Sequence, residues 1–104
     1  MIFIVLSSDN CHSCTILKRV LVDLGLNWEI KYKDSRFHAN DPEIFELLNI
    51  TSVPTIVEEL WFNEYKIQAT GFKDCVAFAK EIKNLSTPIP ELNEIYPSEV
   101  MEAE

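Results

Sequence analysis

Two cysteines separated by two residues, Cys11 and Cys14, are the side chains best suited to chemistry in this 104-residue sequence. They follow a short apolar run and open a segment with helical spacing, so they lie at the first turn of an expected helix. Unsatisfied backbone N–H groups and the helix dipole stabilise a thiolate there. The spacing also places both sulfurs on one side of the turn, close enough to be bridged. This pattern predicts a dithiol in which Cys11 attacks a disulfide and Cys14 resolves the mixed disulfide.

A pair of cysteines at this spacing also serves metal sites. Zinc and iron–sulfur clusters bind the same pattern, so a second hypothesis is a metal-binding module that adds Cys75, His12 or His38 to the pair. Structural zinc needs four ligands, and the sequence has no second close cysteine pair. A third hypothesis is a redox-silent domain that keeps the same fold for docking. The helices and strands predicted around the cysteines are needed to choose between these hypotheses.

The first half of the sequence predicts a strand, a helix, a strand and a short helix. Residues 2–6 are continuously apolar, as in a strand buried on both faces. Apolar residues then recur at helical spacing over 13–24, before Gly25. Residues 28–33 alternate like a half-buried strand. After a polar linker over 34–41, Asp41 as N-cap and Pro42 in the first turn predict a helix through Leu48, with Leu47 among its core residues.

The second half predicts a hairpin and a last helix. Residues 55–62 and 65–70 are strand-like on either side of a polar turn, and 72–85 carries apolar residues at helical spacing. The order βαβαββα indicates a compact α/β domain over residues 1–85. Residues 86–104 hold three prolines, five glutamates and no basic residue, which predicts a mostly irregular acidic tail.

One further motif lies after residue 50: the run Val53-Pro54-Thr55. A strand, Cys-x-x-Cys at a helix start and then this run resemble the thioredoxin/glutaredoxin superfamily over residues 2–85. The resemblance implies a thioredoxin-like fold with a four-stranded mixed sheet flanked by helices. It also implies a cis peptide bond before Pro54, beside the cysteines, and pairing of the Val53 backbone with an extended substrate.

Six residues have an expected role. Their position makes Cys11 and Cys14 the expected catalytic pair, and the expected substrate-binding residues are Val53 and Pro54, from the resemblance, together with His12 and Ser13. We expect protein disulfides as substrates and no bound cofactor or metal.

The electron donor is left open between thioredoxin reductase and glutathione. The element order is similar to that of compact glutaredoxins, but Thr70-Gly71-Phe72 resembles the thioredoxin end of the last strand. The usual glutaredoxin lysine ahead of the motif is missing, and Asp9 stands nearby. The small size and hybrid motifs resemble phage and bacterial glutaredoxin-like proteins that donate electrons to ribonucleotide reductase.

Several single residues admit two interpretations. His12 either stabilises the neighbouring thiolate or is an exposed residue without a role. Asp9 is expected to cap the turn before the helix, and Cys75 to be a small buried apolar residue. His38 is expected at the surface. The aromatic side chains of Trp28, Trp61 and Phe37 are expected to pack within the domain more readily than to contact a partner.

The composition excludes several classes of function. A net charge of −8 argues against binding nucleic acid or an anionic membrane surface. No apolar run approaches the ~18 residues that span a bilayer, and the start of the sequence lacks the features of a secretory signal. Three cysteines are an odd count, unlike a disulfide-stapled secreted scaffold. We therefore expect a soluble, monomeric, cytoplasmic protein.

Overall fold

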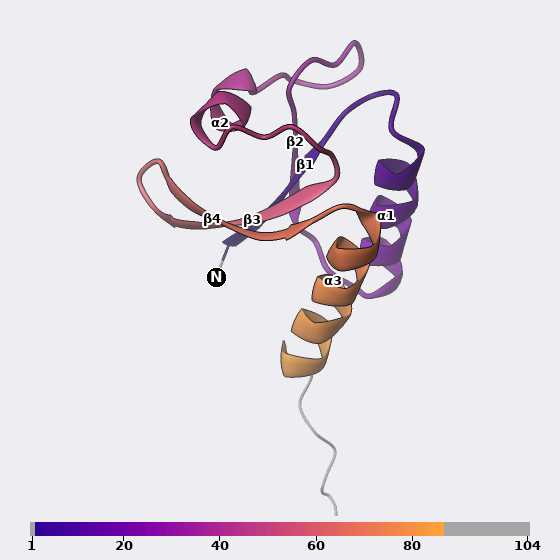
Figure 1. Cartoon of the computed structure of the whole chain (residues 1–104). Helices are drawn as coiled ribbons and strands as arrows, with labels where there is room; N and C mark the ends of the chain where they lie inside the picture. The colour runs from indigo at the N-terminus through magenta and orange to yellow at the C-terminus, as the bar shows by residue number, and fades with distance from the viewer. Residues whose placement is uncertain (1, 87–104) are drawn as a thin grey trace, which may run out of the picture.

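The described part of the chain, residues 2–86 of a computed structural model, contains seven helices and strands in the predicted order βαβαββα. They are β1 (Ile2–Ser7), α1 (His12–Asp23), β2 (Glu29–Tyr32), α2 (Pro42–Leu47), β3 (Thr55–Trp61), β4 (Glu64–Thr70) and α3 (Phe72–Ser86), as labelled in Figure 1. The observed bounds differ from the predicted ones by no more than one residue. The predicted acidic tail, apart from Ser86, lies outside the described residues.

The strands form one mixed sheet in the order β2-β1-β3-β4. β1 pairs with β2 in parallel, and α1 is the crossover between them. The pairs β1/β3 and β3/β4 are antiparallel. Helices α1 and α3 lie side by side on one face of the sheet, and α2 covers the other face (Figure 1). This arrangement confirms the predicted thioredoxin-like α/β fold.

The core has two parts because successive side chains of a strand point to opposite faces of the sheet. Phe3 and Val5 of β1 pack under α1 and α3, in a cluster with Leu17. Ile4 and Leu6 of the same strand pack under α2. The strand β1 lies inside the sheet with a helix layer on each side, which explains why its sequence is apolar without alternation.

Asp41 is the N-cap residue of α2, as predicted, but its carboxylate accepts a hydrogen bond from Lys31 Nζ, at 2.8 Å, and caps no helix amide. Two details of the sequence interpretation are wrong. Leu47 is 57% exposed and does not face the core. The packing expected of Phe37 and Trp61 is absent, since their exposed fractions are 77% and 76%. Trp28 does pack as expected, against the ring of Phe3.

No helix among residues 2–86 is long and apolar enough to cross a membrane. The described residues form one sheet with a helix layer on each face. The candidate site lies at one end of the two central strands, where β1 ends before α1 and where β3 begins.

Candidate active site

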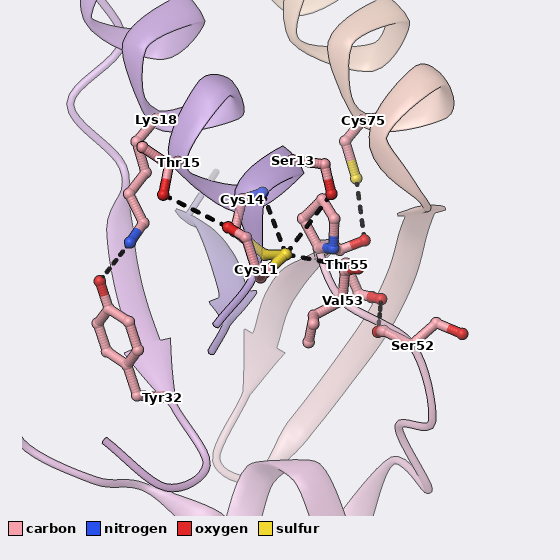
Figure 2. Close-up of a disulfide and its surroundings, with 11 residues drawn as sticks. Cys11, Ser13, Cys14, Thr15, Lys18, Tyr32, Ser52, Val53, Thr55 and Cys75 are labelled. Atoms are coloured by element: carbon pink, nitrogen blue, oxygen red, sulfur yellow. Dashed lines mark hydrogen bonds between the residues drawn. A yellow bond between two sulfur atoms is a disulfide. The ribbon is translucent and has the colours of Figure 1, made fainter. Parts of the chain in front are cut away.

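Cys11 and Cys14 are joined by a disulfide at the N-terminus of α1 (Figure 2), with their Cα atoms 5.1 Å apart. Cys11 is the N-cap residue, in an extended conformation. The backbone N–H of Cys14 donates to Cys11 Sγ at 3.1 Å, so the sulfur takes the place that a serine or aspartate oxygen occupies in an ordinary cap. The first-turn amide is thereby directed at the sulfur that is expected to be the nucleophile.

The two cysteines differ in exposure. Cys11 is a partly exposed residue, whereas Cys14 is fully buried. Of the pair, Cys11 is therefore the residue that lies at the surface. The dipole of the twelve-residue helix α1 and the Cys14 N–H both favour negative charge on Cys11 Sγ when the disulfide is open.

The loop before β3 lies directly beside the disulfide. The peptide bond between Val53 and Pro54 is cis, as the resemblance implied. The carbonyl oxygen of Val53 lies 3.9 Å from Cys11 Sγ. Two hydrogen bonds hold this loop: Thr55 Oγ1 donates to Ser52 O at 2.8 Å, and the Gly71 N–H donates to Pro54 O at 2.9 Å. The fold thus brings Cys11, Cys14, Val53 and Pro54 together from two distant parts of the chain.

Cys75 supports the same loop from α3. Its side chain is fully buried, and its thiol donates to Pro54 O at 3.5 Å (Figure 2). A second acceptor, Ala69 O, lies 3.7 Å from the sulfur. Burial raises the pKa of the Cys75 thiol to about 11, so it stays protonated at neutral pH. The expectation of a small buried cysteine is confirmed, with a hydrogen bond to the loop in addition.

The two residues between the cysteines are placed differently. Ser13 is half-buried, and its hydroxyl lies 3.5 Å from Cys11 Sγ. His12 is exposed on the first turn of α1. Ser13 therefore belongs to the immediate surroundings of Cys11 Sγ, and His12 lies at the surface beside it.

Asp9 does not cap the turn before α1, contrary to the sequence interpretation. Its two carboxylate oxygens accept hydrogen bonds from the Ser35 hydroxyl and the Arg36 N–H, both at 2.7 Å. The Ser35 hydrogen bond, with help from the Arg36 amide, lowers the pKa of the Asp9 carboxyl below its ordinary value of 3.8. Asp9 is thus an anionic anchor for the linker between β2 and α2.

A side-chain stack fixes the same linker to the sheet. The nearly buried ring of Tyr32 stacks on His38, with ring centroids 4.3 Å apart and planes 5° apart. Lys18 Nζ of α1 donates to Tyr32 Oη at 2.5 Å (Figure 2). His38 is exposed, as expected of a surface residue, but it has this contact. Sequence reasoning missed these contacts of the linker, because no periodicity marks it.

Comparisons with protein-family models, curated proteins and solved structures find no match. Within residues 2–86, no three His, Cys, Asp or Glu side chains are grouped so as to hold a metal ion. In that part of the chain the metal-binding hypothesis rests on the cysteine pair alone. The site is therefore defined by its own geometry: a Cys-x-x-Cys disulfide at the start of α1 in a thioredoxin-like fold.

Proposed function

We propose that this protein is a thiol–disulfide oxidoreductase, a dithiol electron carrier that reduces protein disulfides through Cys11 and Cys14. The observation that carries the proposal is the place of Cys11, a partly exposed residue whose sulfur lies 3.1 Å from a helix N-terminal amide and 3.9 Å from the Val53 carbonyl oxygen. An extended substrate that pairs with the Val53 backbone has its own disulfide next to Cys11 Sγ.

Reduction of a substrate disulfide takes two successive thiol–disulfide exchanges. The Cys11 thiolate attacks one substrate sulfur, the substrate S–S bond breaks, and the second substrate sulfur leaves with the electron pair and takes up a proton. Cys14 then loses its proton and attacks Cys11 Sγ, which closes the enzyme disulfide and releases the first substrate sulfur as a thiolate. The substrate disulfide becomes two thiols, and the enzyme dithiol becomes the observed disulfide.

A reductant must reopen the enzyme disulfide after each cycle. The two candidate donors are thioredoxin reductase with NADPH, and glutathione kept reduced by glutathione reductase and NADPH. We place the carrier in the cytoplasm, where a reducing environment keeps such a couple turning over. Ribonucleotide reductase is one candidate protein substrate, on the basis of the resemblance. Turnover in the two reconstituted systems identifies the donor.

Insulin-disulfide reduction tests the proposal. The wild-type protein should cycle between two accessible thiols and a disulfide and should reduce insulin when dithiothreitol supplies electrons. Cys11→Ser should lose this activity, because it removes the nucleophile. Cys75→Ala is the matched control, since it removes one cysteine and keeps the reversible couple. Full activity in Cys11→Ser would refute the assignment of the nucleophile, and a wild-type protein with no reversible dithiol couple would refute the function.

A further inference from the structure

The linker between β2 and α2, residues 33–41, is ordered around the side chain of Ser35. The Ser35 hydroxyl donates to Asp9 and accepts from the N–H groups of Phe37 and His38, each at 3.0 Å. The Ser35 N–H donates to Asn40 Oδ1 at 2.6 Å. One serine thus binds both sides of the turn and ties it to the segment before Cys11. In Figure 1 the linker arches beside the segment that joins β1 to α1.

The middle and the last residue of the linker are held by strand β2. The stack of His38 on Tyr32 fixes its middle, and the Asp41 N–H donates to Tyr32 O at 2.7 Å. Lys31 Nζ of β2 binds the Asp41 carboxylate. The linker therefore presents its remaining side chains from a fixed frame, and a partner that binds them loses little chain entropy in ordering the loop.

A hollow of about 290 Å³ lies between this linker and the segment before the disulfide. Asp9, Asn10, Arg36 and Phe37 line it, and Asn10 immediately precedes Cys11. Phe37 is 77% exposed although the fold anchors its backbone on both sides. Exposed aromatic and arginine side chains in a preformed hollow are typical of the centre of a protein interface.

The strand order places this hollow opposite the Val53 loop. Because β1 lies between β2 and β3, Cys11 stands between the linker that follows β2 and the loop that precedes β3. A chain that pairs with Val53 and crosses the disulfide therefore meets the hollow next.

The charges in the hollow favour one kind of side chain. Both carboxylate oxygens of Asp9 are held by hydrogen-bond donors of the linker, although the carboxylate keeps its negative charge. Arg36 is exposed and is the only cation among the four lining residues, and its guanidinium matches a carboxylate of a partner.

We propose that this hollow is the docking site for the protein that carries the substrate disulfide. It takes a large apolar side chain, close in sequence to the attacked cysteine, on the ring of Phe37, and a neighbouring acidic residue against Arg36. This inference rests on the proposed function and adds the kind of protein substrate that the site selects.

The test uses short peptides that each contain one intramolecular disulfide, with phenylalanine or alanine beside the attacked cysteine and glutamate or lysine one position further. Wild type should reduce the phenylalanine peptide with a kcat/KM about tenfold above that of the alanine peptide, because its KM for the phenylalanine peptide is lower. Phe37→Ala should abolish this preference, and Arg36→Glu should reverse the preference for glutamate over lysine. Hydroxyethyl disulfide, which is too small to reach the hollow, should react equally with all variants.

Phe62→Ala is the matched control for Phe37→Ala. Phe62 is 96% exposed and follows the last residue of β3, whereas Val53 precedes the first residue of that strand. The Phe62→Ala variant should keep the peptide preference. Ser35→Ala should raise KM for the phenylalanine peptide with kcat unchanged, and Ser35→Thr, which keeps the hydroxyl, should restore it.

An active wild type whose peptide preference survives Phe37→Ala would overturn the docking site and leave the proposed function standing. Equal losses on hydroxyethyl disulfide would also overturn it, since they would indicate damage to the disulfide itself. A wild type that reduces none of these disulfides would instead refute the proposed function, and the docking inference with it.

Discussion

The backbone N–H of Cys14 points at Cys11 Sγ from 3.1 Å, so the residue expected to resolve a mixed disulfide also stabilises the sulfur expected to form it. If this N–H keeps its place when the disulfide opens, it favours the Cys11 thiolate, the reactive form. Cys14 and Cys75 are both fully buried. We therefore expect iodoacetamide to alkylate Cys11 at neutral pH at least about tenfold faster than either other cysteine. Peptide mapping by mass spectrometry after brief exposure measures this order, and modification of Cys14 first would contradict it.

Removal of the resolving sulfur should trap the first exchange. In Cys14→Ser the mixed disulfide between Cys11 and the substrate has no internal thiol to break it. We expect the variant to accumulate a covalent adduct with a peptide disulfide, visible by intact mass and released by dithiothreitol. The double variant Cys11→Ser, Cys14→Ser should form none. An adduct in the double variant would instead indicate that Cys75 reacts.

The fold could be predicted from the sequence because its signals are local. The apolar run of β1, the helical spacing after Ser13 and the polar turn at Asn63 each report on neighbouring residues, and the observed bounds follow them closely. Leu47 shows the limit of this reasoning. It shares the apolar spacing of α2, but the helix has only six residues and covers one end of the sheet, which leaves Leu47 exposed.

The candidate site could be predicted only in part, since its contacts join distant segments. The cysteine pair is a local motif, and Val53 and Pro54 came from a resemblance. The hydrogen bonds of Asp9 to the linker span 26 and 27 residues, and an aspartate before a helix reads first as a cap. The exposure of Phe37 was also missed: its backbone N–H binds Ser35 of the same linker, and the linker in turn is fixed by Asp9 and Tyr32, which are distant in sequence.

The hydrogen bonds of Asp9 to the linker should stabilise the fold at neutral pH and be lost in acid. Hydrogen bonds from Ser35 and Arg36 hold the pKa of the Asp9 carboxyl below its ordinary 3.8, so its contribution is present above that pH and is lost as the pH falls through the folded-state value. Asp9→Asn should lower the thermal midpoint at pH 7, and the difference from wild type should shrink towards about pH 2. Asp34→Asn, at an exposed carboxylate of the same linker, is the control. A difference that persists unchanged in acid would contradict the anchor.

A substitution at Leu17 of α1 measures how much the packing of this helix contributes to stability. Its side chain is fully buried in the cluster under α1 and α3, so Leu17→Ala should leave a cavity and reduce the free energy of unfolding by about 3 kcal/mol. Val22 of the same helix is 75% exposed, so Val22→Ala should change this free energy by less than about 0.5 kcal/mol. Urea denaturation of the two variants measures both values. Equal effects would mean that α1 does not pack on the sheet as described.

The buried thiol of Cys75 should make the fold less stable as the pH rises, whereas Asp9 makes it less stable as the pH falls. Burial raises the pKa of its thiol from 9.0 to about 11, so the unfolded chain loses this proton first as the pH rises. The stability that the neutral thiol contributes is complete below pH 9 and declines towards pH 11. With Cys11 and Cys14 held as the disulfide, Cys75 has the only thiol of the three cysteines. The free energy of unfolding of wild type should therefore fall more steeply over this range than that of Cys75→Ala. Parallel curves from urea denaturation would show that the thiol ionises as easily in the folded protein as in the unfolded chain.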